Sequence, residues 1–255
     1  MELNCDLSLA AKYHSPSQQA RVLSESWFAR NAYCLACDAD SVEQTRANTR
    51  ATDFVCSKCR QRYELKTFHR RPHGSLVDGA FAPMMERINA GTAPTLCLLE
   101  RTEEWQIRSL TAIHSSFLVS EVIEERPPLK PTAKRHGFVG CNIRLDHIAS
   151  DGEIAVVSRG VIQPVAEVRA QFQRFLPLAK KSAEQRGWTL LTLRMVRELQ
   201  KNSFNLHDLY AMEKDFAKAY PQNRHIRDKI RQQLQILRDL GVLAFEERGV
   251  YRILD

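Results

Sequence analysis

Two closely spaced pairs of cysteines constrain this chain more than any other feature of its sequence. The pairs are Cys34 with Cys37 and Cys56 with Cys59, each in a C-x-x-C arrangement. Thiolates at this spacing can converge on one tetrahedral ion, which predicts a closed structural Zn²⁺ site. Such a site stabilises the fold and leaves no coordination position open for catalysis. A redox-active C-x-x-C motif is the alternative, but two neighbouring pairs favour zinc.

The composition is that of an ordinary globular protein with an excess of positive charge. Of the 255 residues, 44% are hydrophobic and 26% are charged, and the formal net charge is +7. Basic proteins of this size often bind polyanions. No apolar run is long enough to span a bilayer, and the first residues lack a secretory signal, so we expect a cytoplasmic protein with no membrane partner. Three scattered cysteines are expected to be reduced core residues: Cys5, Cys97 and Cys141.

Two acidic residues and a lysine lie on either side of the second cysteine pair. Asp53 precedes that pair, and Glu64, Leu65 and Lys66 follow it. Side chains two positions apart on a strand project from the same face, so Glu64 and Lys66 would point together. Asp53, on the preceding strand, could reach the same side. Two carboxylates at that distance could hold Mg²⁺, which prefers oxygen ligands and keeps waters for the substrate.

These residues predict the chemistry of phosphodiester hydrolysis. The metal would polarise a phosphate oxygen and acidify a bound water. Lys66 would orient that water or stabilise the negative charge that develops. Leu65 would point into the core, and its backbone carbonyl could provide a further metal ligand. The alternative is a solvated strand face on which these charges form ordinary salt bridges.

Hydrophobic patterning predicts a mixed α/β domain over residues 1–182. Helices are expected at 15–30 and 75–90, where apolar residues recur at helical spacing. Strands are expected at 51–55, 62–66, 95–99, 105–110, 117–123, 142–145 and 154–157. Residues 38–50 are polar and unpatterned, which indicates an exposed loop.

A second loop, at 126–140, is basic. It contains three prolines, two glycines and four cations. Proline lacks the N–H that a strand ladder needs, so an irregular segment is expected. Within it, Lys134, Arg135 and Phe138 are candidates for contact with a nucleic acid.

Residues 183–255 have the pattern of a winged helix-turn-helix domain. Helices are expected at 188–199, 205–216 and 224–240, with Asn205 as an N-cap and Gly241 ending the third. A hairpin follows at 242–254. The outward face of the third helix carries arginine and glutamine side chains, which read guanine and adenine edges in the major groove. The predicted DNA-binding residues are Arg224, Arg227, Arg231, Gln232 and Gln235. A winged helix used for protein contact is the alternative.

The chain resembles the DpnI type of restriction endonuclease over nearly its full length. The residues that carry the resemblance are Met1-Glu2-Leu3, Tyr33-Cys34, Asp53-Phe54, Tyr63-Glu64-Leu65-Lys66, Asp78-Gly79-Ala80, Gly140-Cys141-Asn142-Ile143, Arg186-Gly187-Trp188-Thr189 and the stretch 230–239. They follow the family's order with matching separations. The exposed loop at 38–50 diverges.

The resemblance implies a PD-(D/E)XK nuclease core of α/β (α+β mixed-sheet) class with an inserted four-cysteine zinc site and a C-terminal winged helix. It implies that Asp53, Glu64 and Lys66 are the catalytic residues. It also implies that a monomer cleaves double-stranded DNA at GATC when the adenine carries an N6-methyl group, and that both domains read the methylated site. In that family a tryptophan of the basic loop contacts the methyl groups, whereas this chain has Phe138.

Two classes of function follow from these observations. The first is a type II, methyl-directed deoxyribonuclease that uses catalytic Mg²⁺ and structural Zn²⁺. The second is a zinc-containing winged-helix regulator that binds DNA without cutting it. The arrangement of Asp53 with Glu64 and Lys66 favours the nuclease, because a pure binding protein does not need it. An RNA-processing nuclease is a third hypothesis, which the major-groove character of the third helix disfavours.

Overall fold

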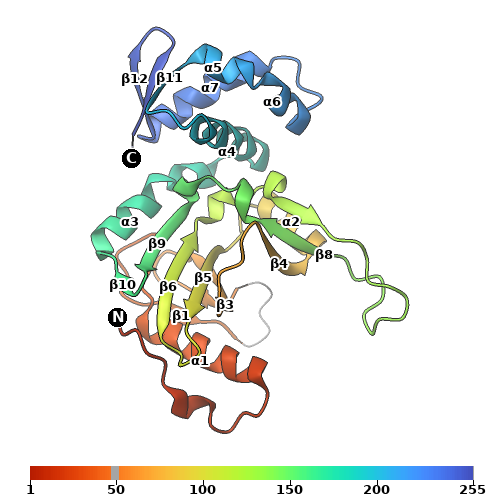
Figure 1. The fold of residues 1–255 in the computed structure, drawn as a ribbon, viewed down its shortest axis with the longest axis vertical. Helices are drawn as coiled ribbons and strands as arrows, with labels where there is room; N and C mark the ends of the chain where they lie inside the picture. The colour runs from red at the N-terminus through yellow and green to blue at the C-terminus, as the bar shows by residue number, and fades with distance from the viewer. Residues whose placement is uncertain (47–51, 255) are drawn as a thin grey trace.

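A seven-stranded sheet forms the centre of the molecule (Figure 1). The computed structural model describes residues 1–46 and 52–254. The strands lie in the order β1 (Glu43–Gln44), β2 (Phe54–Val55), β3 (Arg62–Phe68), β5 (Thr95–Arg101), β6 (Ile107–Ile113), β9 (Glu153–Ser158) and β10 (Val161–Ile162). Only β3 and β5 pair in parallel, and the other neighbours are antiparallel.

Alternation along β5 explains how the sheet is buried on both faces. Cys97 and Leu99 point into a core cluster shared with α1 (Pro16–Asn31) and α3 (Val165–Arg174). Leu96 and Leu98 point into the cluster on the other side, shared with α2 (Phe81–Asn89). Each leucine buried in this way contributes about 2 kcal/mol of hydrophobic stabilisation. The strand is therefore apolar from Leu96 to Leu99, where both of its faces are covered.

A second sheet, of three strands, packs beside the first. Its order is β4 (Ser75–Ala80), β8 (Gly140–Arg144) and β7 (Ile123–Glu125), all antiparallel. The predicted helix at 75–90 is therefore wrong in its first half, since only residues 81–89 are helical. Residues 75–80 are extended because their backbone pairs with β8, a segment far away in the sequence. The basic loop is irregular over residues 126–139, as expected, and protrudes from the body in Figure 1, whereas Gly140 already belongs to β8.

The predicted strand at 117–123 is also wrong. Residues 115–117 and 120–122 form two short 3₁₀ turns, η2 (Ser115–Phe117) and η3 (Ser120–Val122), and β7 begins only at Ile123. Phe117, Leu118, Val119 and Val122 are all buried, so the apolar run reflects burial from every side and not the alternation of a strand. His114 caps η2 by accepting a hydrogen bond from the amide of Ser116.

The remaining expectations for the first region hold with shifted boundaries. Helix α1 and strands β3, β5, β6, β8 and β9 are confirmed. The loop expected at 38–50 contains the two-residue strand β1, and the strand expected at 51–55 is limited to β2, so that Asp53 lies just before it. Residues 47–51 lie outside the described residues. None of the described helices is long and apolar enough to cross a membrane.

The C-terminal region contains the expected helices and hairpin. These elements are α4 (Ala183–Glu198), α5 (Leu206–Ala211), α6 (Glu213–Ala219), α7 (Ile226–Asp239), β12 (Leu243–Glu247) and β13 (Val250–Ile253). The predicted second helix is broken at Met212 into α5 and α6, and an unexpected strand, β11 (Ser203–Asn205), pairs with β13. Asn205 caps α5 with a capping box, and Gly241 follows α7 with a φ of 71°.

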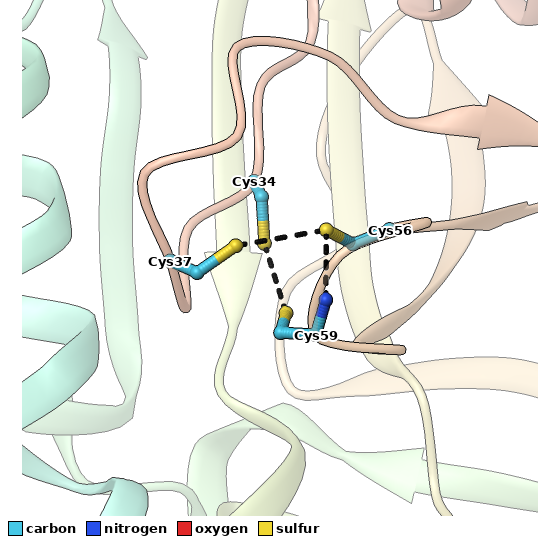
Figure 2. A group of neighbouring side chains, drawn as sticks. All are labelled: Cys34, Cys37, Cys56 and Cys59. Atoms are coloured by element: carbon cyan, nitrogen blue, oxygen red, sulfur yellow. Dashed lines mark hydrogen bonds between the residues drawn. The ribbon is translucent and has the colours of Figure 1, made fainter.

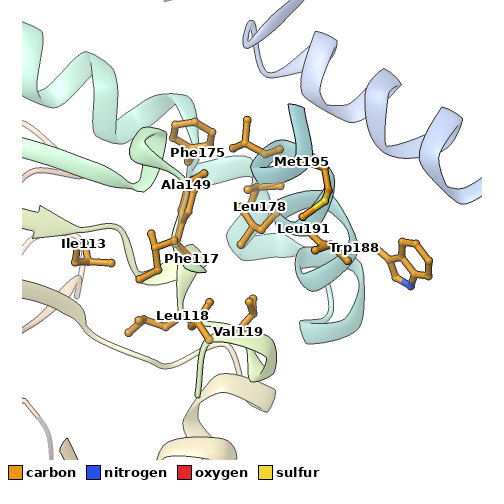
Figure 3. Packing of buried hydrophobic residues seen from close by; sticks show 14 of the residues in the cluster. Ile113, Phe117, Leu118, Val119, Ala149, Phe175, Leu178, Trp188, Leu191 and Met195 are labelled. Atoms are coloured by element: carbon orange, nitrogen blue, oxygen red, sulfur yellow. The ribbon is translucent and has the colours of Figure 1, made fainter. Parts of the chain in front are cut away.

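Helix α4 is buried by both parts of the chain. It begins at the capping box formed by Ser182 and Gln185, where the proposed boundary between residues 182 and 183 falls. Figure 3 shows Leu191 and Met195 directed toward Phe117 and Leu178, while Trp188 points to the opposite side. There Trp188 stacks on Tyr220, with ring centroids 4.0 Å apart. One continuous core therefore crosses the proposed boundary.

Candidate active site and zinc centre

The four paired cysteines meet at one point in space (Figure 2). Their sulfur atoms all lie within 4.8 Å of one another. The Sγ atoms of Cys34 and Cys59 are 3.5 Å apart, and those of Cys37 and Cys56 are 3.6 Å apart. A tetrahedral zinc ion with Zn–S bonds of about 2.3 Å places its sulfurs roughly 3.8 Å apart. The residues present therefore fit Zn²⁺, as the sequence predicts.

A tight turn brings the sulfurs of the second pair together. In the second pair the amide of Arg60 donates to the carbonyl of Cys56 at 2.9 Å, and Arg60 adopts a positive φ of 65°. The amide of Cys59 also points at the sulfur of Cys56, 3.5 Å away. Helix α3 supports the first pair, because Arg169 donates to the carbonyls of Cys34 and Ala39 at 3.1 and 2.8 Å.

Strand β3 separates the cysteine cluster from the three predicted catalytic side chains. Tyr63 and Leu65 face the cluster that contains Cys34 and Cys56. Leu65 packs against that core, as the alternation predicts. Glu64 and Lys66 project from the opposite face of the strand, the face that β4 and α2 cover.

The structure brings Asp53 close to Glu64 and Lys66. The amide of Leu65 donates to Asp53 Oδ2 at 2.8 Å, and the amide of Asp53 donates to the carbonyl of Tyr63 at 2.9 Å. These two bonds tie Asp53 to the residues of β3 on either side of Glu64. Lys66 Nζ lies 2.7 Å from Glu64 Oε1. Two carboxylates and an ammonium thus occupy one short segment of the sheet.

A further carboxylate, which the sequence patterns did not single out as catalytic, joins this group. Asp78 on β4 places Oδ1 2.6 Å from Lys66 Nζ, and its side chain is only 3% exposed. The expectation of a helix at 75–90 hid the role of Asp78, because a residue in that helix would not be expected to pair with a side chain of β3. The available signal was the Asp78-Gly79-Ala80 motif within the resemblance.

Burial dominates the electrostatics of the site. It raises the pKa of Glu64, an effect that Lys66 opposes and that the negative charges of Asp78 and Asp53 reinforce. Burial alone would lower the pKa of Lys66, but Glu64 and Asp78 together outweigh it and raise that pKa above its ordinary value. Glu64 Oε2 is buried and has no hydrogen-bond partner among the residues that the structure describes. A buried oxygen of this kind is a ready ligand for a cation.

The outer face of α7 carries most of the predicted DNA-binding residues. Arg227, Arg231, Gln232 and Gln235 are all exposed on the helix. Arg224 is exposed as well, but α7 begins at Ile226, so the prediction that Arg224 belongs to the helix is wrong.

Two of these arginines are held by neighbouring side chains. Arg227 Nε lies 2.8 Å from Glu213 Oε2 on α6. Arg231 donates to the hydroxyl of Tyr210 at 2.8 Å and pairs with Asp228. Holding both guanidinium groups in place lowers the entropy that they lose on binding a ligand.

The basic loop presents its own cations and one aromatic ring. Lys134 and Arg135 are exposed, and Phe138 is half-buried. The guanidinium of Arg135 lies over the Phe138 ring, 4.0 Å from its centroid. The amides of Leu129 and Gly137 close the loop by donating to the carbonyls of Phe138 and Leu129 at 3.0 and 3.1 Å.

Comparison with protein-family models agrees with this architecture. Residues 1–181 match the model of the Dam-replacing family, DpnI, and residues 184–253 match the Dam-replacing HTH domain. The chain belongs to the Dam-replacing family. The predicted resemblance is thereby confirmed over both regions of the chain.

Membership of the Dam-replacing family supports a restriction-type nuclease with a methyl-directed role. The match to its HTH domain supports DNA binding through the C-terminal region. The cysteine cluster, which could hold zinc, belongs to the part of the chain that the larger model covers.

Proposed function

We propose that the chain is a type II restriction endonuclease that uses Mg²⁺ to cleave double-stranded DNA at GATC sites containing N6-methyladenine. In this proposal Asp53, Glu64 and Lys66 are the catalytic residues of a PD-(D/E)XK core, and the protein acts as a monomer. The observation that carries the proposal is the buried carboxylate of Glu64. One of its oxygens contacts Lys66, and the other has no hydrogen-bond partner among the described residues.

Asp53 and Glu64 would hold the Mg²⁺ ion, with the carbonyl of Leu65 as a further ligand. The donor set fits because carboxylate and carbonyl oxygens are the ligands that this ion prefers. When bound, the ion supplies polarisation of a phosphate oxygen and acidification of water. The hydrogen bond from the Leu65 amide fixes Oδ2 of Asp53, which leaves Oδ1 for the ion.

Lys66 supplies a fixed positive charge beside the phosphate. Its ammonium is paired with Glu64 and Asp78 and so carries its proton. An ammonium held there stabilises negative charge on the phosphate oxygens as the bond to the leaving group breaks. The surrounding apolar core strengthens this attraction by lowering the local dielectric constant.

The basic loop and α7 would bind the duplex. Lys134 and Arg135 would contact phosphates, and the exposed face of α7 would read base edges in the major groove. Phe138 would provide apolar contact to the N6-methyl groups. Burying one methyl contributes about 0.8 kcal/mol of binding free energy. If two domains each read the methyl group of one strand, the preference for methylated over unmethylated DNA would be multiplied.

Digestion of plasmid DNA tests the proposal. Adenine-methylated and unmethylated copies of one plasmid are incubated with the protein, with and without Mg²⁺. The proposal predicts fragments that end at GATC from the methylated copy only, and only with Mg²⁺. Binding of both copies without any cleavage would instead favour a zinc-containing winged-helix regulator. Equal cleavage of both copies would contradict methyl recognition.

A further inference from the structure

We infer that Asp78 is a positioning residue that holds the ammonium of Lys66 in place for catalysis. The inference rests on the proposed function, since it concerns the same site. It begins from the contact between Asp78 Oδ1 and Lys66 Nζ at 2.6 Å, which is as close as the contact of Lys66 with Glu64 at 2.7 Å.

The position of Asp78 is fixed by the second sheet. β4 pairs with β8, where Asp78 lies opposite Cys141, and the register shifts between Asp78 and Ala80. A bulge of this kind redirects a side chain. Here the Asp78 side chain is turned to Lys66 and is only 3% exposed. Because a buried carboxylate needs a cationic partner, its placement against Lys66 is the arrangement that makes its burial tolerable.

Once Mg²⁺ is bound, Glu64 cannot neutralise both the ion and the ammonium of Lys66 equally. Its Oε1 contacts Lys66, and its buried Oε2 is the oxygen that would be available to Mg²⁺. When the charge of Glu64 is shared with a divalent ion, its attraction for Lys66 is weakened. Asp78 remains as the full negative charge that keeps the ammonium paired and prevents it from moving toward the metal ligands.

The geometry argues against a role for Asp78 as a third ligand of the same ion. Among the described residues, only the four cysteines form a group of three or more potential ligands whose donor atoms lie within 4.8 Å of one another. Asp53, Glu64 and Asp78 do not form such a group. Asp78 therefore acts through Lys66.

A double-mutant cycle tests this assignment. Asp78→Asn keeps the shape of the side chain and removes its charge. Lys66→Met removes the ammonium and keeps a flexible, largely aliphatic side chain. Single-turnover cleavage of a methylated duplex is measured at saturating protein and Mg²⁺. Asp78→Asn is expected to slow cleavage by roughly 10- to 100-fold, as loss of an outer partner does in metal sites. In the Lys66→Met background the same change is expected to have an effect of no more than about twofold.

Two measurements besides activity complete the test. Calorimetric titration with Mn²⁺ in the absence of DNA is expected to give the same affinity for wild type and Asp78→Asn. In urea, Asp78→Asn and Lys66→Met are each expected to lower the unfolding midpoint, and the double variant is expected to recover part of the loss. The double-mutant cycle measured in urea can still be interpreted if Lys66→Met has no measurable cleavage. Asp146→Asn is the matched control, because that carboxylate also pairs with a cation, Arg144 at 2.7 Å, but is 43% exposed.

Each outcome has a distinct meaning. If the wild type cleaves methylated DNA and Asp78→Asn cleaves it at the same rate, the positioning role is overturned and the proposed function stands. Additive effects of Asp78→Asn and Lys66→Met in the cleavage and urea cycles have the same meaning. A large loss of Mn²⁺ affinity in Asp78→Asn makes Asp78 a metal ligand and also overturns it. A wild-type protein that cuts no methylated DNA overturns the proposed function itself.

Discussion

The hydroxyl of Tyr63 lies 3.2 Å from the sulfur of Cys34 and accepts a hydrogen bond from the amide of Leu35 at 2.9 Å. Tyr63 is the residue before Glu64 on β3 and is 1% exposed. The cysteine cluster and the candidate active site therefore share one strand, with the cysteines on one face and the carboxylates on the other. Burial, followed by the nearby Cys34, raises the pKa of Tyr63, which keeps its hydroxyl protonated.

Replacing Tyr63 by Phe tests this connection. The ring packing is kept, but the contact with the Cys34 sulfur and the Leu35 amide is lost, at a cost of about 1–3 kcal/mol for the unpaired buried amide. We expect faster release of zinc to a colorimetric chelator. Tyr33→Phe is the matched control, since the Tyr33 hydroxyl has no hydrogen-bond partner among the described residues. Equal zinc release from both variants would show that Tyr63 does not support the site.

Loss of a zinc ligand should unfold the first region of the chain. Cys56→Ser removes a buried sulfur from the cluster that joins the segment after α1 to the turn before β3. Since the binding energy of a structural zinc site is folding energy, we expect loss of the cooperative thermal transition together with activity. Circular dichroism and zinc content check this. Cys5→Ser is the control, and full activity after complete zinc removal would show that the centre is dispensable.

Arg231 should contribute to binding of the methylated site. It lies on the exposed face of α7, held by Tyr210, and Arg231→Ala is expected to weaken binding by about 1–3 kcal/mol. Fluorescence anisotropy with methylated and scrambled duplexes in Ca²⁺ measures this. Arg238→Ala, at the other end of the same helix, removes the same charge as a control. An affinity and a sequence preference that both stay unchanged in Arg231→Ala would rule out major-groove placement of α7.

His114 should make the protein less stable in mild acid. Burial lowers the pKa of His114 from 6.5 to about 3, an effect only partly offset by the Phe172 carbonyl. Its Nδ1 accepts a hydrogen bond from the Ser116 amide at 3.0 Å, which requires a neutral ring. Above about pH 6.5 His114 is neutral in both the folded and the unfolded chain, so it does not change the free energy of unfolding with pH. Below that pH only the unfolded chain binds it, and the free energy of unfolding falls by up to about 1.4 kcal/mol per pH unit.

The comparison of His114→Asn with wild type isolates this contribution. Urea unfolding at pH 7.5 and at pH 5.5 should show that the stability advantage of wild type shrinks at the lower pH. The two proteins differ only at position 114, so the pH effects of all other groups cancel in the difference. His136→Asn, in the exposed part of the basic loop, is the control. A difference that does not change with pH would mean that His114 binds its proton equally well in the folded and unfolded states.

Local patterns were sufficient to predict part of this molecule. The spacing of the four cysteines, the alternation of Glu64 and Lys66 and the amphipathic stripe of α7 each depend on a few neighbouring residues. They were found because the sequence carries their signal over a short stretch. The N-cap at Asn205 and the stop at Gly241 were recognisable for the same reason.

Features that depend on distant segments were not predicted. β4 is extended because it pairs with β8, and β11 forms because it pairs with β13. Val77 and Gly79 are weak helix formers, but residues 75–80 alone do not reveal the partner strand β8. The error hid Asp78, whose relation to Lys66 exists only when the two sheets pack together. The run around Phe117 is buried on all sides, so its periodicity carried no information about its conformation.

The most direct test of the candidate active site is the single-turnover cleavage rate of Asp53→Asn on a methylated GATC duplex in Mg²⁺, measured beside its binding affinity. We expect unchanged binding and a rate lowered by about 10²- to 10⁴-fold, since the carboxylate that would hold the ion is lost. Asp40→Asn, which alters a carboxylate that is 97% exposed, should cut like wild type. An Asp53→Asn protein that cleaves at the wild-type rate would contradict the assignment of Asp53, Glu64 and Lys66 as the catalytic residues.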